Sequence, residues 1–337
     1  MRRLFTFIAA IAALLVTAAP ALACGGLIGP NGAVNLLRTT TFAGYHDGVE
    51  HYVTAFEFAG GGGAFGSIVP LPDVPTSVER GGDWTLQRLV RETEPPSLRL
   101  EAAAAPADAQ VLLQTRIDAL DITILRGGGA EVGKWAADHG FRLPPDAPEV
   151  LDFYANRSPI FMAASFDADA ARERGQQIGD GTPVHLTIPT DQPWVPLRIL
   201  GLGKVAGETV QADVYLLTDA RPNLLPAPAS NGLALDHSAA ASDGLLADLR
   251  SDKGMEWIPA SGWLSKVRID ADAAQLKFDL AIDPTGSGMP SLIDTGLGAT
   301  LPPPTLPSGG LLLLWLLVGI GIAIPTASSL ALAMRPR

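Results

Sequence analysis

Histidine and acidic side chains close together in the sequence are the first candidates for chemistry. His46 and His51 flank a turn that also carries Asp47 and Glu50, and all four are residue types that bind divalent metals. In an extended strand, neighbouring side chains point to opposite faces, so His51 and Glu50 should diverge. We therefore interpret these residues as solvated polar groups and predict no metal site.

Two further acidic pairs resemble fragments of calcium-binding loops. Asp167 and Asp169 precede an alanine-rich segment, and so do Asp270 and Asp272. Neither pair is followed by the glycine and distal glutamate that a calcium loop requires. Both pairs are therefore interpreted as acidic residues at helix N-termini, where they offset the helix dipole.

Glycine and nucleophile motifs do not identify an enzyme. Gly61, Gly63 and Gly66 have the spacing of a dinucleotide fingerprint, but a strand pattern follows where that fingerprint requires a helix, so no cofactor is predicted. The sequence contains no Gly-x-Ser-x-Gly, His-Glu-x-x-His or phosphate-loop motif, and catalytic residues stay unassigned.

One enzymatic alternative stays open. Paired carboxylates that hydrolyse an envelope glycan are brought together by the fold, so their spacing in the sequence cannot exclude them. Tryptophans suit a glycan platform, although most are expected to pack in the core. The tryptophans considered are Trp84, Trp135, Trp194, Trp257 and Trp263.

The N-terminus is typical of an export signal. Arg2 and Arg3 precede the apolar segment Leu4–Ala19, which is short for a bilayer of about 30 Å, and Ala21–Ala23 suits signal peptidase. Residues 1–23 are therefore predicted to be a cleaved signal peptide.

Cys24, the only cysteine, would then begin the mature chain. A lone cysteine forms no internal disulfide, and two alternatives stay open: lipidation of Cys24 or a free N-terminal thiol. Ala21 stands where a lipoprotein signal normally has leucine, and this favours the free thiol.

The C-terminus is typical of a membrane anchor. A helix over Leu311–Met334 would be about 36 Å long, enough to cross the bilayer once. The basic end, residues 335–337, favours a cytoplasmic tail and a main domain on the extracytoplasmic side of the cell membrane. Because residues 306–310 precede the apolar run like a processing signal, a cleaved sorting tail is the alternative.

The part between these ends is an acidic domain followed by a linker. Residues 284–310 contain six prolines and one charge, which predicts a semi-extended linker after an extracytoplasmic domain over residues 24–283. The protein has a net charge of −11. This acidity argues against nucleic acid and against an anionic lipid surface as partners.

Strand patterns dominate that domain. Val49–Phe58 alternates, a glycine run follows, and Phe65–Leu71 begins a partner strand, so a hairpin is predicted. Scattered helices among runs of strands favour an α+β fold that is β-rich and mainly antiparallel. Further strands are predicted at Val111–Leu125, Ile160–Phe166, Val184–Ile188, Leu197–Leu200 and Val210–Leu217, and helices at Trp84–Arg91, Ala130–His139, Ala147–Tyr154 and Leu245–Ser251.

Several of these residues, in this order, resemble an uncharacterised bacterial family known as domain of unknown function 2330. They are Cys24–Gly26, Ile68–Pro75, Trp135 with Gly140 and Phe141, Tyr154, Ile160–Phe166 and Pro196–Arg198. The resemblance implies an exported, often anchored protein and brings no established activity. Family members often have a second early cysteine, which this chain lacks.

The sequence therefore predicts a single-pass, membrane-anchored extracytoplasmic bacterial protein with a binding or envelope-associated structural role. Its expected partners are the membrane and an envelope protein or glycan. The alternative is the envelope glycan hydrolase with paired carboxylates.

Overall fold

The computed structural model describes residues 26–29, 32–33, 39–57, 65–93, 116–173, 175 and 181–297. All belong to the first of two compact units, Met1–Leu297. Within these residues, none of the helices has both the length and the apolar character needed to cross a bilayer. The predicted signal peptide, Cys24 and the predicted anchor Leu311–Met334 lie outside the described residues.

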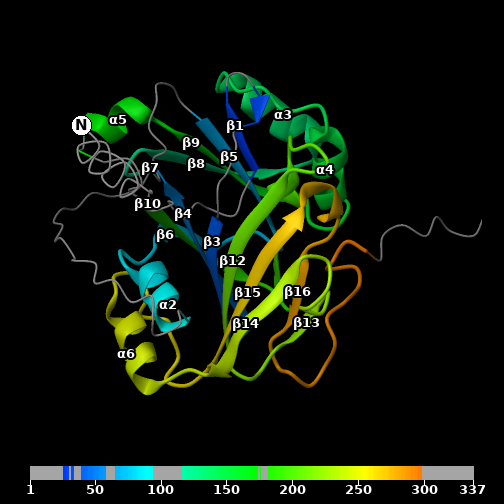
Figure 1. Ribbon diagram of the computed structural model, residues 1–337. Coiled ribbons are helices and arrows are strands. Elements are labelled where there is room, and N and C mark those ends of the chain that lie inside the picture. The colour runs from blue at the N-terminus through cyan, green and yellow to red at the C-terminus, as the bar shows by residue number, and fades with distance from the viewer. Residues whose placement is uncertain are drawn as a thin grey trace, which may run out of the picture. The chain divides into compact units, whose positions relative to one another are not determined.

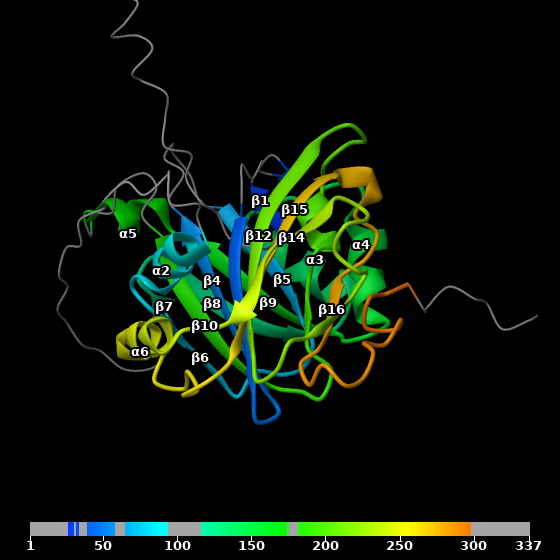
Figure 2. The ribbon, with the colours of Figure 1, turned by 60° about the horizontal axis from the view of Figure 1, so that its bottom comes forward.

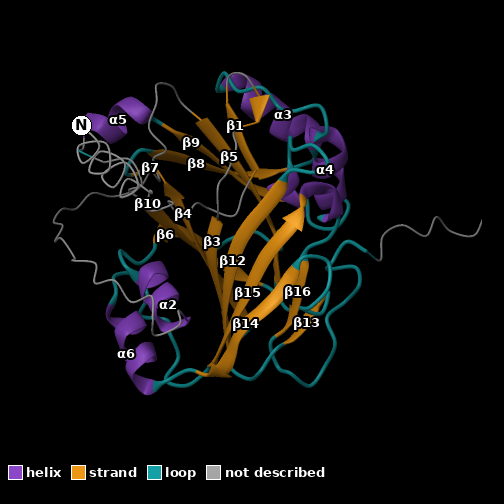
Figure 3. Cartoon of the chain, viewed as in Figure 1, coloured by secondary structure: helices purple, strands orange, loops and turns teal. Residues whose placement is uncertain are grey.

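The strands form three sheets (Figures 1 and 3). All described pairings are antiparallel except that of β12 with β3. In spatial order the seven-stranded sheet contains β14 (Leu233–Ala240), β15 (Trp263–Asp272), β12 (Thr209–Thr218), β3 (Thr39–His46), β4 (Val49–Glu57), β10 (Gly181–Pro189) and β6 (Ser77–Arg80). The six-stranded sheet contains, in spatial order, β2 (Gly32–Ala33), β1 (Gly26–Gly29), β5 (Phe65–Leu71), β9 (Ile160–Phe166), β8 (Leu120–Arg126) and β7 (Arg116–Ile117). The three-stranded sheet contains β11 (Trp194–Val195), β16 (Leu280–Asp283) and β13 (Asn223–Leu225).

The helices within the described residues are few, as the sequence predicted. Gly140, with φ of +75°, ends the helix that contains Trp135, because glycine adopts this left-handed conformation readily. The hydroxyl of Ser242 accepts a hydrogen bond from the N–H of Leu245 at 3.2 Å and caps another helix. The helices are α2 (Thr85–Thr93), α3 (Gly129–Asp138), α4 (Ala147–Ala155), α5 (Ala168–Glu173) and α6 (Asp243–Ser251), with 3₁₀ turns η2 (Arg198–Gly201) and η3 (Ala273–Gln275).

Four layers stack within this unit. Helices α2 and α6 cover one face of the seven-stranded sheet, where Leu89 and Leu249 join a buried cluster with Phe42, Val53 and Tyr215. The opposite face packs on the six-stranded sheet. Figures 1 and 2 show α3 and α4 on the far side of the sheets from α2 and α6. Strand β9, which is buried along almost its whole length, is correspondingly apolar, whereas the edge strand β14 is mostly half-buried or exposed and carries Asp236 and His237.

The predicted hairpin between Val49–Phe58 and Phe65–Leu71 is wrong. These segments are β4 and β5, but β4 pairs with β3 and β10, whereas β5 pairs with β1 and β9 in the other sheet. The hairpin that does form joins β3 to β4 through Asp47 and Gly48, which have φ of +50° and +78°. Asp-Gly is the preferred dipeptide for such a two-residue turn.

One element type and one domain boundary also differ from what the sequence predicted. The predicted strand Leu197–Leu200 is the 3₁₀ turn η2, because the N–H groups of Leu197 and Arg198 donate to the carboxylate of Asp279 and not to a neighbouring strand. Residues 284–297, expected in the linker, belong to the first compact unit, and Thr295 among them is fully buried.

Candidate functional site

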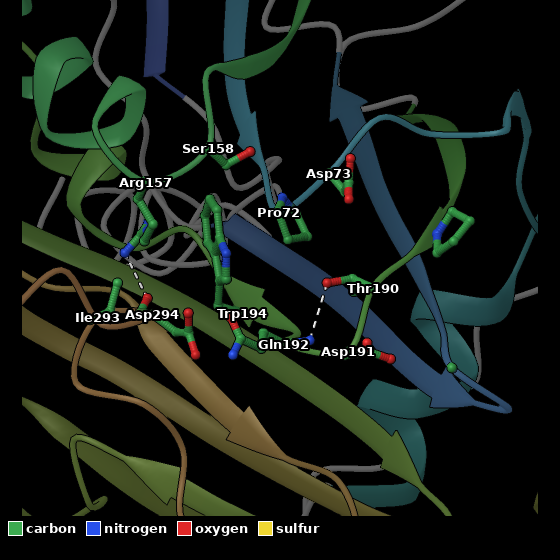
Figure 4. Close-up of a pocket in the computed structure, with 12 residues that line it drawn as sticks. Pro72, Asp73, Arg157, Ser158, Thr190, Asp191, Gln192, Trp194, Ile293 and Asp294 are labelled. Carbon is green, nitrogen blue, oxygen red and sulfur yellow. Dashed lines mark hydrogen bonds between the residues drawn. The ribbon is translucent and has the colours of Figure 1, made fainter.

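A pocket of about 560 Å³ lies where strands of both large sheets begin or end. The seven-stranded sheet contributes the turn between β3 and β4 and the loop after β10, and the six-stranded sheet contributes the segments after β5 and before β9. Figure 4 shows Ile293 and Asp294, near the end of the unit, on one side of the pocket. The lining residues are Gly48, Pro72, Asp73, Arg157, Ser158, Pro189, Thr190, Asp191, Gln192, Trp194, Ile293 and Asp294.

The pocket is acidic. Asp73, Asp191 and Asp294 bring three carboxyl groups to it, and Arg157 is the single basic side chain in its lining. The guanidinium of Arg157 is already paired with the buried carboxylate of Asp279, which itself does not line the pocket. The lining therefore favours a ligand that carries positive charge and groups able to form hydrogen bonds.

Arg157 and Trp194 pack against each other in one wall of the pocket. The guanidinium lies 4.0 Å from the centroid of the Trp194 ring, and that ring stacks on Tyr154 at 5.9 Å. The hydroxyl of Tyr154 donates to Asp279 at 2.8 Å, so the same carboxylate holds both Tyr154 and Arg157. Arg157 also donates to the backbone carbonyl of Asp294 at 2.6 Å, the contact dashed in Figure 4.

The carboxyl group of Asp294 is protonated more readily than that of an exposed aspartate. Burial raises its pKa, and this effect outweighs the opposing effects of the Arg157 cation and of the N–H of Ser291. A carboxyl group with a raised pKa stays protonated to higher pH and can then donate a hydrogen bond or a proton.

A second acidic residue with a raised pKa lies inside the sheets, two residues after the pocket-lining Gly48. Glu50, on β4, is fully buried opposite Tyr45 of β3 and Ile188 of β10. Burial raises the pKa of Glu50 to about 8, although the backbone N–H of Trp194 lies close enough to lower it in part. Neither carboxyl oxygen has a well-formed hydrogen bond within the described residues. At neutral pH Glu50 is therefore mainly uncharged.

The structure does not bring the flagged histidines into one site. His46 contacts Asp219 at 2.7 Å and Asp47 at 3.3 Å. His51 instead points to the face covered by α2 and α6, where its Nδ1 lies 2.9 Å from Nε2 of His185. Among the described residues, no group of three or more histidine, cysteine or acidic side chains is arranged to hold a metal.

Trp257 completes the environment of the two histidines. The His51 ring stacks on Trp257 with centroids 3.8 Å apart and an angle of 2° between the ring planes. Burial lowers the pKa of His51 to about 3 and that of His185 to about 4. Both rings are therefore neutral at pH 7 and form part of the packing.

The other candidates have structural roles. Asp167 caps α5 by accepting from the N–H groups of Asp169 and Ala170, both at 3.0 Å, as the sequence predicted. Asp272 caps η3 by accepting from Ala274 at 2.8 Å, whereas Asp270 lies inside β15. The five tryptophans form no common platform in the described region, since Trp135 and Trp194 are buried and belong to different elements.

Three site residues were not recognisable from the sequence. Arg157, Asp191 and Asp294 each stand in a segment without a motif, and they meet only because the ends of the two sheets converge. Trp194 was flagged as a tryptophan, but nothing in the sequence indicated that Arg157 stacks on it. Glu50 was interpreted as a solvated polar residue, and this was wrong, because its side chain is fully buried and its pKa is raised.

Comparison with known proteins identifies a family. The sequence profile of the family described as "Uncharacterized protein conserved in bacteria (DUF2330)" matches residues 18–232. No curated protein matches the chain. The matched residues include β4, β5, β9 and β10, whose ends line the pocket.

The solved structures that match this chain are only remotely similar to it. The crystal structure of baculovirus P35 has a TM-score of 0.39 and 9% identity over 73% of this chain and 96% of that chain. A mutated baculovirus P35 after caspase cleavage, at 2.7 Å resolution, has a TM-score of 0.38 and 9% identity over 73% and 98%. These scores are too low to support a conclusion about fold or function.

Proposed function

Because this chain belongs to the bacterial family known as domain of unknown function 2330, whose description names no activity, we propose a function from its own sequence and geometry. It is a binding protein, held on the extracytoplasmic side of the cell membrane by the C-terminal apolar segment. Its pocket takes a small polar ligand with a positive charge. The single observation that carries the binding role is the gathering of three carboxyl groups around one basic side chain that is already paired.

The proposed location rests on the two ends of the sequence. An export signal over residues 1–23 and a single membrane helix over Leu311–Met334 would leave the folded unit outside the cytoplasm. The measurement is fractionation of cells that produce the full chain and a chain ending at Ser308. The full chain should remain in the membrane after alkaline extraction, and the shortened chain should be released as a soluble protein.

Ligand charge is tested with two sugars that differ at one group. Glucosamine carries an amine that is protonated at neutral pH, whereas N-acetylglucosamine has the same ring without the charge. In calorimetric titrations of the full chain in detergent, glucosamine should bind more tightly. Asp191→Asn should weaken its binding at least about tenfold, because one charged hydrogen bond contributes about 1.5–3 kcal/mol. Asp138→Asn, on the exposed side of α3, is the matched control.

Equal binding of the two sugars, or no effect of Asp191→Asn, would argue against a cation-binding pocket. The location proposal would be unaffected, because fractionation tests it separately.

One observation favours a second function, the hydrolysis of an envelope glycan. The raised pKa of Asp294 is suited to a general acid, and the carboxyl groups of Asp73 and Asp191 line the same pocket. Release of reducing sugars from isolated envelope glycan, lost in Asp294→Asn, would support hydrolysis. Binding without turnover would support the first proposal.

A further inference from the structure

The last segment of the folded unit, residues 289–297, exposes apolar side chains. Of the eight large hydrophobic residues that are exposed among those described, four lie in these nine positions. Met289 is 75% exposed, Leu292 56%, Ile293 59% and Leu297 46%. Scattered exposed apolar residues are normal, but such a concentration in one short segment marks an interaction surface.

The same segment buries two of its three polar residues. Asp294 is 7% exposed and Thr295 is fully buried. The carbonyl of Thr295 accepts from the N–H of Asp279 at 3.0 Å, and that of Asp294 accepts from Arg157. The segment is thus firmly attached with its polar side inward, and its apolar side chains have no cover among the described residues. In water, the favoured arrangement is the opposite one, with apolar side chains buried and polar side chains exposed.

The position of the segment in the chain indicates what covers it. Thirteen residues, 298–310, separate Leu297 from the apolar run that begins at Leu311. Fully extended, they reach at most about 45 Å, so the segment stays close to any bilayer that holds Leu311–Met334. A bilayer surface is therefore the apolar partner available at high effective concentration.

We propose that residues 289–297 dock on the outer surface of the membrane and insert Met289, Leu292, Ile293 and Leu297 into the interface. The inference rests on the proposed membrane anchor. Insertion is driven by apolar burial and not by headgroup charge, because the acidic protein would be repelled by anionic lipid. Ile293 also lines the pocket, so docking places the mouth of the pocket at the membrane surface.

The test uses the full chain in vesicles of pure phosphatidylcholine. In a Cys24→Ser background, Leu292→Cys is labelled with the environment-sensitive dye NBD. The matched control is Val205→Cys, because Val205 is similarly exposed (66%) in the loop between η2 and β12. Nitroxide-labelled lipid should quench the dye at position 292 at least threefold more than at position 205. Adding 30% phosphatidylglycerol should not increase this quenching.

Each outcome decides the proposal. Similar weak quenching at positions 292 and 205, with the protein still floating with the vesicles, would overturn docking and leave the anchor intact. A full chain that does not float with vesicles would instead refute the anchor on which docking rests. A blue-shifted dye at position 292 without lipid quenching would mean that the chain itself covers the segment, which also overturns the proposal. Loss of quenching in Met289→Asp/Ile293→Asp, with the protein still floating, would confirm that these apolar side chains carry it.

Discussion

Three ionisable residues of the seven-stranded sheet, two of them buried and His51 partly buried, disfavour their charged forms. Glu50 faces the six-stranded sheet, whereas His51 and His185 face α2 and α6. Burial is the main cause of each shifted pKa. Their effects on stability have opposite signs, because a carboxyl group becomes charged by losing a proton and a histidine by gaining one.

Glu50→Gln should stabilise the protein at neutral pH. Folding raises the pKa of Glu50 from 4.5 to about 8, so its contribution to stability is fully present below pH 4.5 and is lost as the pH rises through 8. Glutamine does not titrate, so the variant should gain about 3 kcal/mol at pH 7 and little at pH 4.5. Urea unfolding at both pH values is the measurement. A gain of equal size at both, or a similar gain for the exposed control Glu79→Gln, would contradict the prediction.

The histidine pair should make the protein sensitive to mild acid. Folding lowers the pKa of both rings below 6.5, so their contribution is present above pH 6.5 and is lost as the pH falls toward 4 and then 3. The loss should approach about 1.4 kcal/mol per pH unit for His185 and be smaller for the partly exposed His51. It is measured by urea unfolding from pH 6.5 to 4.5 in the Glu50→Gln background, where the opposing carboxyl group is absent.

Two substitutions separate the pair from other titrating groups. His51→Gln combined with His185→Gln should flatten the dependence of the unfolding free energy on pH. An unchanged dependence in the double variant would show that the pair does not cause the acid sensitivity.

At the scale of elements, one carboxylate joins α4, η2 and β16. Asp279, which precedes β16, accepts from the hydroxyl of Tyr154 at 2.8 Å and from the N–H of Leu197 at 2.7 Å, and it pairs with Arg157. Both members of the pair are buried, with exposed side-chain fractions of 7% and 0%. Such a carboxylate stabilises the fold because its removal leaves a buried cation without a partner.

Asp279→Asn should therefore be strongly destabilising. Loss of one partner of a buried ion pair costs about 3–5 kcal/mol, and urea unfolding at pH 7 measures it. The control is Asp138→Asn, which breaks the exposed pair with Lys134 on α3 and should change the unfolding free energy little. A loss below 1 kcal/mol in Asp279→Asn would show that this junction is not a centre of stability.

At the scale of the whole molecule, the boundary of the folded unit lies at Leu297 and not at Asp283. The fourteen residues between them return to the body of the unit, where Gly296 packs against the ring of Phe153. An added Cβ at Gly296 would lie 2.0 Å from that ring, so the approach requires glycine. The linker available between the folded unit and the predicted anchor is correspondingly shorter.

Two shortened chains test this boundary. Residues 24–297 should fold with the same urea midpoint as residues 24–310. Residues 24–283 should be less stable by at least about 2 kcal/mol, because the hydrogen bonds to the carbonyls of Asp294 and Thr295 are lost. Equal stability of 24–283 and 24–297 would show that the linker begins at Pro284.

The sequence by itself located helices α2, α3, α4 and α6 and indicated the family, but it located only some of the strands: β3, β14 and β15 were not predicted. Alternating apolar residues located β4, and Gly140 located the end of α3, because these signals are local. The calcium-like pair at Asp167 was also interpreted correctly as a helix cap. The Asp47-Gly48 turn carried a readable hairpin signal that the glycine run near Gly61 obscured.

Only the tertiary structure decided which sheet each strand joins and which side chains share the pocket. Arg157 and Asp279 are 122 residues apart, and His51 and His185 are 134 apart, so no local pattern relates them. Strand partners are selected by burial of both sheet faces, and this choice separated β4 from β5. The raised pKa of Glu50 and the exposed apolar side chains of residues 289–297 also depend on the tertiary structure. Burial and exposure are set by how the elements pack and not by the order of residues in the sequence.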